Sequence, residues 1–441
     1  MGDISFILSN IVGVLTDPST MMFVVVGTFM GLVFGALPGL TATMAVALLI
    51  PMTFTLPPVT AIGMMLGAYV GGMAGGAVSA TLLNIPGTPS AVVTTLDGYP
   101  MAKQGRGAEA LGWAAFASGF GSFISWAVLV LLAPTLARLC TGFAPPEYAA
   151  LAVFGLTIIS AVSGKSVTKG IIAGIIGMTL AFVGLDPVWG DLRFTFGEVN
   201  LMSGISTMPA LIGLYSIPQI LGGCTEKNTV KNVKVKMSNF IPSPKKLWKA
   251  KVNIVRSSII GTIIGIIPAT GGNIAAFLAY DQAKRFTKED PESFGKGNPE
   301  GVVASEAANN GVCGGALIPM LTLGIPGDSV TAVLLGGLLI HGLTPGPSMF
   351  SDHYDVIIGI FTTLLVATVV MVLLQVVGIQ LFVKILSVPT NYLSATLVVL
   401  SLVGSYALRT NIFDVFLTII LGTAGYFLMR AGFPVAPTVL G

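Results

Sequence analysis

The chain has 441 residues, of which 54% are hydrophobic and only 9% are charged, and its mean hydropathy is +0.88. Soluble domains carry about 25% charged residues, so this composition excludes an ordinary soluble protein and indicates an all-α, polytopic membrane protein. Three cysteines without a CxxC spacing and two histidines also argue against a zinc site or a Cys/His catalytic pair.

Along the chain, residues 4–15 are apolar but have no positive segment before them, so no cleavable signal peptide is expected. Nine of the 22 Lys and Arg residues lie between positions 227 and 256. This stretch could serve nucleic-acid binding, but the positive-inside rule favours a cytoplasmic loop. Apolar runs of about the length that spans a bilayer lie at 111–137, 148–163, 170–185, 356–386, 393–408 and 412–429.

Two pairs of apolar segments are interrupted by Pro and Gly in similar patterns. Residues 31–39 (GLVFGALPG) match 261–269 (GTIIGIIPA), and residues 84–88 (NIPGT) match 324–328 (GIPGD). A broken helix survives in a bilayer only where it is buried or lines a wet cavity. Breaks in corresponding places of two halves therefore predict broken helices, or re-entrant hairpins, that bind a substrate at the midplane. The alternative for both GxxxG pairs is close helix packing.

Further matches at slowly growing spacings predict two copies of one unit. Residues 68–76 match 308–316 at a spacing of 240, and residues 146–148 match 390–392 at 244. The predicted organisation is an N-terminal segment 1–20, repeat 1 at 21–221, a basic cytoplasmic linker at 222–252 and repeat 2 at 253–441. No later segment matches 199–221, so the native chain is expected to continue beyond residue 441.

Loop charges favour inverted repeats. In the first copy the loop 51–60 is uncharged and the loop 97–109 carries Lys103 and Arg106, whereas in the second copy 281–300 is basic and 341–355 has no Lys or Arg. Equivalent loops would then lie on opposite sides of the membrane. Inversion requires 21–50 and 253–280 to be hairpins that return to one side. If each crosses the membrane, the repeats are parallel.

The breaks suit the recognition of a carboxylate. A helix N-terminus carries unpaired N–H groups and about half a positive charge, and no Lys or Arg lies deep in an apolar span. The predicted substrate-binding residues are Pro38, Gly39, Thr41, Thr43, Asn84, Gly87, Thr88, Ser90, Gly271, Gly272, Asn273, Gly327, Asp328 and Ser329.

Membrane-embedded polar residues supply candidates for a coupling ion, Na⁺ or H⁺. They are Asn84, Glu306, Asn309, Asn310 and Asp328, of which Glu306, Asn309 and Asn310 share one helical face. Asp328 follows the second IPG directly, so it either binds a cation or caps a helix. The alternative for Glu306 is a polar helix start after a charged loop.

Four other acids or bases are interpreted without a binding role. Asp414 and Arg409 are predicted to form an interfacial pair, and Asp97 with Lys103 is expected in an ordinary loop.

The motifs together resemble those of the large membrane subunit of the tripartite tricarboxylate transporter family, the TctA type. The resemblance rests on residues 31–39 with Thr41, on 84–90 and 97–102, and on 306–327, and it extends over essentially the whole chain. Thr41 departs from the pattern, because a glycine is often found there.

The resemblance implies a multi-pass permease of the bacterial inner membrane. Its expected partners are a small membrane subunit of the TctB type and a periplasmic binding protein of the TctC type that delivers carboxylates. Transport would be driven by a cation gradient, often Na⁺, and the chain contains no GxxxxGK[ST] phosphate loop.

We therefore expect a carboxylate uptake permease with no cofactor and no enzymatic activity. A domain that carries the four breaks would move, elevator-like, against a scaffold of 111–185 and 356–430. A channel with a broken-helix filter is the alternative. An intramembrane protease is disfavoured because Glu306 and Asp328 form no recognisable pair of carboxylates.

Overall fold

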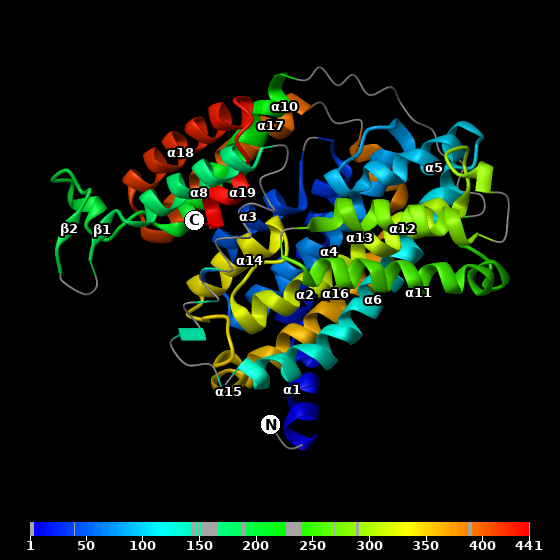
Figure 1. The fold of residues 1–441 in the computed structure, drawn as a ribbon, viewed down its shortest axis with the longest axis horizontal. Coiled ribbons are helices and arrows are strands. Elements are labelled where there is room, and N and C mark those ends of the chain that lie inside the picture. The colour runs from blue at the N-terminus through cyan, green and yellow to red at the C-terminus, as the bar shows by residue number, and fades with distance from the viewer. Residues whose placement is uncertain are drawn as a thin grey trace. The chain divides into compact units, whose positions relative to one another are not determined.

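The computed structural model describes residues 4–38, 40–140, 166–186, 190–225, 240–268, 270–287, 291–386 and 390–440, with a few single positions between 141 and 165. Helices dominate these residues, and their only strands, β1 (Gly184–Leu185) and β2 (Leu192–Arg193), pair antiparallel (Figure 1). Within the same residues, five helices are long and apolar enough to cross a membrane: Pro18–Ala36, Pro58–Leu83, Gly107–Cys140, Tyr354–Ile385 and Ile412–Arg430. The predicted all-α, polytopic class is confirmed. The predicted span 148–163 lies almost entirely outside the described residues.

The chain divides into two compact units, of which the first comprises Met1–Leu49, Thr55–Thr141 and Asn228–Pro389. Its described elements are α1 (Ile4–Thr16), α2 (Pro18–Ala36), most of α3 (Ala42–Thr53), α4 (Pro58–Leu83), η1 (Pro89–Ala91), α5 (Val92–Lys103), α6 (Gly107–Cys140), α11 (Pro244–Ile266), α12 (Gly271–Phe286), η4 (Pro291–Ser293), α13 (Pro299–Leu323), α14 (Ser329–Ile340), α15 (Met349–Asp352) and α16 (Tyr354–Ile385). The four predicted breaks all fall in this unit.

Proline and a polar cap define where several of these helices begin. Asp17 accepts hydrogen bonds from the N–H groups of Ser19 and Thr20 at the start of α2, and the next residue is Pro18. Ser243 before Pro244 and Asn298 before Pro299 cap α11 and α13 in the same way. Proline fits the first helical turn because its missing N–H would have no partner there.

Glycines allow α2 to lie directly on α4. A Cβ atom on Gly31 would lie 2.3 Å from the carbonyl oxygen of Ala68, and one on Gly35 would lie 2.2 Å from that of Gly72. On α11, a Cβ on Gly261 would lie 2.2 Å from the carbonyl oxygen of Ala308 on α13. The close-packing interpretation of both GxxxG pairs is therefore confirmed.

The second unit comprises Ile50–Phe54, Gly142–Lys227 and Thr390–Gly441. Its described elements are α8 (Val167–Ala181), β1, β2, η2 (Val199–Leu201), α9 (Thr207–Leu211), a π-helical turn η3 (Ile212–Ser216), α10 (Ile217–Thr225), α17 (Thr390–Arg409), α18 (Ile412–Arg430) and α19 (Val435–Leu440). Leu214, Leu417 and Leu421 form a small apolar core in this unit.

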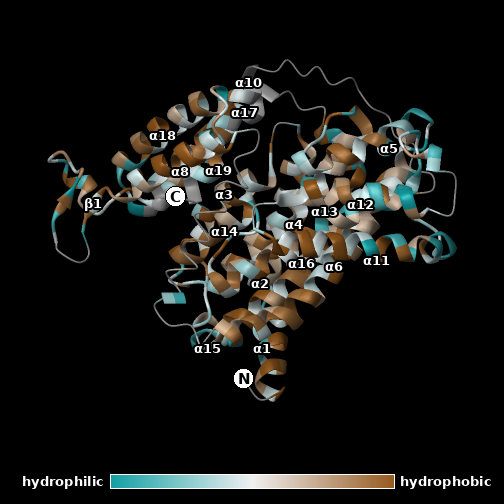
Figure 2. Cartoon of the chain, viewed as in Figure 1, coloured by the Kyte–Doolittle hydropathy of each residue, from teal (hydrophilic) through white to brown (hydrophobic). Residues whose placement is uncertain are grey.

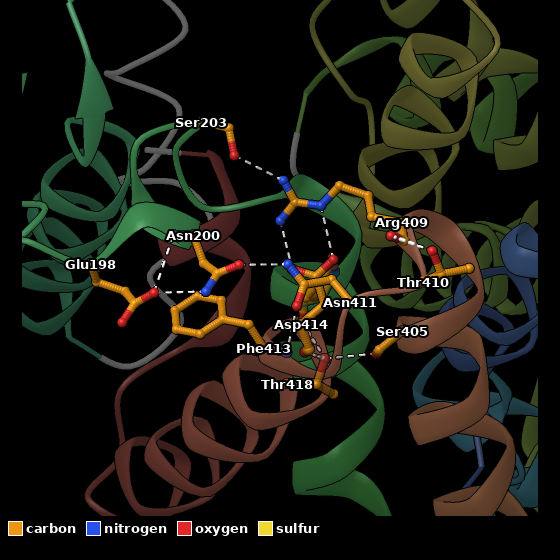
Figure 3. A network of polar contacts seen from close by, with 11 residues as sticks. Glu198, Asn200, Ser203, Ser405, Arg409, Thr410, Asn411, Phe413, Asp414 and Thr418 are labelled. Carbon is orange, nitrogen blue, oxygen red and sulfur yellow. Dashed lines mark hydrogen bonds and ion pairs between the residues drawn. The ribbon is translucent and has the colours of Figure 1, made fainter.

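A polar network joins the loop between α17 and α18 to η2 in the second unit (Figure 3). The guanidinium of Arg409 donates from Nε to Asp414 Oδ2 at 2.9 Å and from Nη2 to Oδ1 at 2.6 Å. Asn411 Nδ2 donates to Asn200 Oδ1 at 2.8 Å. The predicted Arg409–Asp414 pair is confirmed, and it is a bidentate bond to a fully buried carboxylate.

One feature of the predicted scaffold is wrong. The sequence predicts that residues 111–140 and 356–386 belong to the scaffold. In the structure these residues form α6 and α16, which belong to the unit that contains the breaks. Trp126 on α6 donates its indole N–H to the carbonyl oxygen of Phe361 on α16 at 2.8 Å. The serine- and glycine-rich face of α6 packs on α13, and hydropathy alone does not reveal that partner.

Candidate functional site

All four predicted breaks are interruptions of helix. The chain leaves α2 at Ala36 and enters α3 at Ala42, with Pro38 between them, and it leaves α11 at Ile266 and enters α12 at Gly271. Gly39 lies outside the described residues. In the two IPG breaks, the residue that ends the preceding helix has a left-handed backbone: φ is 58° at Asn84 and 70° at Gly324. Asn84 is therefore a helix-ending residue with an exposed side chain.

The glycine of each IPG element packs on the end of the first broken helix in the same half. A Cβ on Gly87 would lie 2.0 Å from the carbonyl oxygen of Gly35, and one on Gly327 would lie 2.7 Å from that of Gly265. Only glycine permits these approaches, so Gly87 and Gly327 hold each pair of breaks together.

The first junction between the halves is the α3–α14 contact. Thr41 caps α3 by accepting the N–H of Met44 at 3.2 Å, and the hydroxyls of Thr43 and Ser329 lie 3.0 Å apart. The starts of a helix from the first half and of one from the second half thus meet through hydroxyl groups.

Asp328 is the N-cap of α14, which is one of its two predicted roles. Its Oδ1 accepts the backbone N–H and the hydroxyl of Thr331, both at 2.8 Å. The backbone N–H of Asp328 in turn donates to Thr331 Oγ1 at 2.9 Å. Its Oδ2 accepts the hydroxyl of Tyr69 on α4 at 2.6 Å. The carboxylate is thus bonded on both oxygens by the protein's own groups.

The second junction is the α12–α5 contact. Gly271 begins α12 with φ of 67°, and a Cβ on Gly272 would lie 2.8 Å from Asn309 Oδ1 and 2.9 Å from Ser90 Cβ. Ser90, in the η1 turn before α5, lies 3.2 Å from the hydroxyl of Thr88. No side-chain bond caps the start of α12, and Asn273 in its first turn is exposed.

The face of α13 next to this contact is buried and polar. Glu306 accepts hydrogen bonds from the hydroxyls of Thr94 on α5 and Ser118 on α6, the latter at 3.1 Å. Glu306, Asn309 and Asn310 are all fully buried. The alternative interpretation of Glu306, a polar helix start, does not fit this position, because Glu306 lies two turns inside α13.

The amide groups of Asn309 and Asn310 have a defined orientation. Asn309 Nδ2 donates to the carbonyl oxygen of Met73 at 3.0 Å, and Asn310 Nδ2 donates to Ser122 Oγ at 3.2 Å and to the carbonyl oxygen of Val70 at 3.4 Å. A carbonyl acceptor requires the NH₂ end of each amide. Both Oδ1 atoms are buried and have no hydrogen-bond partner among the described residues.

Asp97 is not the ordinary loop residue that the sequence predicts. It lies on α5 and is fully buried, and its Oδ1 accepts the N–H groups of Gly295 at 2.9 Å and of Gly297 and Asn298 at 2.8 Å. Its Oδ2 accepts the hydroxyl of Tyr280 at 2.8 Å. One carboxylate of the first half therefore organises the loop that leads into α13.

The sequence-based interpretation missed Tyr69, Thr94 and the serines of α6. The serine signal was present in the sequence: Ser118, Ser122 and Ser125 recur at helical spacing, and all three are bonded to α13. Tyr69 gave no such signal, because its partner Asp328 lies 259 positions away.

Comparison with known proteins places the chain in a family. The model of the tripartite tricarboxylate transporter TctA family matches residues 21–440. An Agrobacterium vitis protein named "Uncharacterized 52.8 kDa protein in TAR-I ttuC' 3'region" is 35% identical over 424 residues, which cover 96% of this chain and 84% of that protein.

A second protein of the same organism, "Uncharacterized protein in TAR-II ttuC' 3'region", is 36% identical over 181 residues, or 41% of this chain and 74% of that protein. No solved structure matches the chain. The family match over nearly its whole length shows that this chain belongs to the tripartite tricarboxylate transporter TctA family.

Proposed function

We propose that the chain is the permease of a secondary active transporter that imports dicarboxylates or tricarboxylates across a bacterial inner membrane. A periplasmic binding protein of the TctC type would deliver the substrate, and a small membrane subunit of the TctB type would complete the transporter. Membership of the family supports these assignments. The absence of a nucleotide-binding loop from the sequence fits transport driven by a cation gradient.

The observation that carries the proposal is the pairing of helix starts from opposite halves. The hydroxyls of Thr43 and Ser329 meet at the α3–α14 contact, and Gly272 adjoins Ser90 and Asn309 at the α12–α5 contact. Helix starts carry a partial positive charge, and the start of α12 has no side-chain cap among the described residues, whereas Thr41 and Asp328 already accept N–H groups at the starts of α3 and α14. A substrate with several carboxylates would bind the N–H groups of α12 and the hydroxyls at both contacts without a buried Lys or Arg.

The order of the elements supports two repeats of one unit, and the loop charges favour their inversion, which would suit an elevator-like motion. In each half a broken helix pair, α2–α3 or α11–α12, precedes a long helix, an IPG break and a short helix, α4–α5 or α13–α14. Each compact unit also takes segments from both predicted repeats. The unit with the breaks would carry the substrate, and the second unit would form part of the scaffold.

The coupling ion is proposed to be Na⁺, held on α13 by the Oδ1 atoms of Asn309 and Asn310, with Glu306 one turn away. A buried acceptor without a donor costs about 1–3 kcal/mol, and a bound cation would remove this cost at either Oδ1 atom. Amide and hydroxyl oxygens suit a hard cation. A proton carried by Glu306 is the other possible driving ion.

Substitution at the two contacts tests the site. Thr43→Val and Ser90→Ala each remove one hydroxyl with little change in volume, and we expect the KM for carboxylate uptake to rise at least tenfold while expression is retained. Thr60→Val is the matched control, because its hydroxyl bonds Thr20 at 2.6 Å between the opening turns of α2 and α4. Unchanged KM values in both site variants would remove these contacts from the substrate site. Flux that never saturates would favour the channel.

A further inference from the structure

One face of α11 is exposed and apolar from Trp248 to the end of the helix. Its exposed residues are Trp248, Val252, Val255, Ile259, Ile263 and, just past the helix end, Ile267. The opposite face, with Ala250, Ser257 and Gly261 among others, is buried. The spacing of three or four residues keeps the exposed set on one stripe. This stripe leads from the basic end of the helix to the break that follows it.

Cations are confined to the first part of α11, as its hydrophilic opening turns in Figure 2 also indicate. The ammonium of Lys251 lies 3.3 Å from the centre of the Trp248 ring, and the guanidinium of Arg256 lies 5.6 Å from that of Phe286. Lys246 is already paired with Glu109 at 2.8 Å. Lys251 and Arg256 lie beside the apolar stripe.

A surface groove joins these two cations to the stripe. It is lined by Lys251, Val252, Val255, Arg256, Ile259 and Ile260, and its surface is almost entirely carbon. The stems of the two basic residues lie with the valines in its N-terminal part, the isoleucines form the other part, and no acid lines it. Arg256 donates to Asn253 Oδ1 at 3.1 Å, while its Nε is buried with no hydrogen-bond partner among the described residues. Glu300, the acid that interacts with Arg256, also accepts a hydrogen bond from the amide of Asn253.

The geometry points to an anionic phospholipid as the occupant of this groove, and we propose that α11 carries a specific site for one. The phosphate would accept hydrogen bonds from Arg256 and pair with Lys251, and an acyl chain would follow the aliphatic wall. At 1.5 Å per residue, the ten residues from Arg256 to Ile266 span about 15 Å. That is about half of a 30 Å hydrocarbon core, which is the depth of one leaflet.

The pattern fits a lipid better than a partner helix. An amphiphile has one charged end and one apolar end, as this groove has. A transmembrane helix in the same place would cover Lys251 and Arg256 and would need its own acid opposite them. Basic pockets at the cytoplasmic ends of membrane helices bind anionic head groups, and the predicted orientation puts this end of α11 in the cytoplasm.

Native mass spectrometry of the detergent-purified chain tests the proposal, with phosphatidylglycerol and phosphatidylcholine of identical acyl chains as the probes. We expect phosphatidylglycerol to bind at least tenfold more tightly. Because both groups would contact the phosphate directly, K251Q/R256Q should lower that affinity at least tenfold. K245Q/K249Q makes the same charge change on exposed lysines outside the groove. This control variant should lower the affinity for phosphatidylglycerol less than threefold.

Val255→Trp provides a second variant that retains both charges. Val255 is exposed, so the larger ring fills the groove without entering the core, and bound phosphatidylglycerol should decrease. Equal losses in the two double variants, or equal affinity for the two lipids, would overturn the proposal. Displacement of phosphatidylglycerol by the added small membrane subunit would also overturn it and would assign the groove to that protein.

Discussion

Gly31→Ala should destabilise the protein, although alanine is the better helix former. The added Cβ would lie 2.3 Å from the carbonyl oxygen of Ala68 and 2.8 Å from both its Cα and the N atom of Gly72. Carbon atoms of this kind essentially never approach another heavy atom within 3.0 Å. The two helices would therefore have to separate by about 0.7 Å, the shortfall at the carbonyl oxygen, against backbone that has no free rotamer.

Overpacking of this kind costs up to about 3 kcal/mol, and alanine in a helix returns about 1 kcal/mol. The expected net loss is about 2 kcal/mol of unfolding free energy. Gly13→Ala is the matched control, because a Cβ on Gly13 in α1 meets nothing within 4 Å, and this variant should gain up to about 1 kcal/mol.

Reversible unfolding in mixed detergent micelles measures both variants against the wild type. A Gly31→Ala protein as stable as the wild type would refute the packing of α2 on α4. It would also remove the reason for placing the first break beside the IPG element of the same half.

Three further substitutions test local parts of the site. Asn84→Gly keeps the left-handed backbone, so it should fold like the wild type, and we expect it to lose uptake because the sequence predicts that the Asn84 amide binds substrate; normal uptake would remove Asn84 from the site. Asp97→Ala leaves three backbone N–H groups and a hydroxyl unpaired and should cost about 3–5 kcal/mol of unfolding free energy, whereas Thr95→Ala, at a half-buried position of the same helix, should change stability by less than about 0.5 kcal/mol. Tyr69→Phe should cost about 1–3 kcal/mol, and a double-mutant cycle with Asp328→Asn should show that most of this cost is shared; additivity would contradict that bond.

The sequence predicted the helical breaks because their causes are local. Pro38, Pro86, Pro268 and Pro326 each remove a helical N–H and disfavour helix at the preceding residue, and all four lie between helices in the structure. Proline alone does not decide this, because Pro134 and Pro319 lie inside α6 and α13. The cap at Asp328 was also predictable as one of two roles, since an acid directly before a helix accepts its first N–H groups.

Contacts over long sequence distances were not predictable. Asp97 looked like a loop residue because the N–H groups that bind it lie about 200 positions later. The α6 and α16 helices looked like scaffold because hydropathy gives the length of a span and not its neighbours. The sequence predicted Asn309 and Asn310 as coupling-ion candidates, but only the bonds from their Nδ2 atoms to the α4 and α6 helices show that the Oδ1 atoms are the ones left to bind a cation.

The most direct measurement of the central claim is carboxylate uptake into proteoliposomes that contain the chain and its small membrane subunit, with purified binding protein outside. A panel of mono-, di- and tricarboxylates would be tested with and without an inward Na⁺ gradient. We expect saturable uptake of dicarboxylates or tricarboxylates that requires the binding protein. The substrate should accumulate above its equilibrium level only while the gradient lasts. Uptake that rises linearly with concentration and is indifferent to Na⁺ and H⁺ gradients would contradict it.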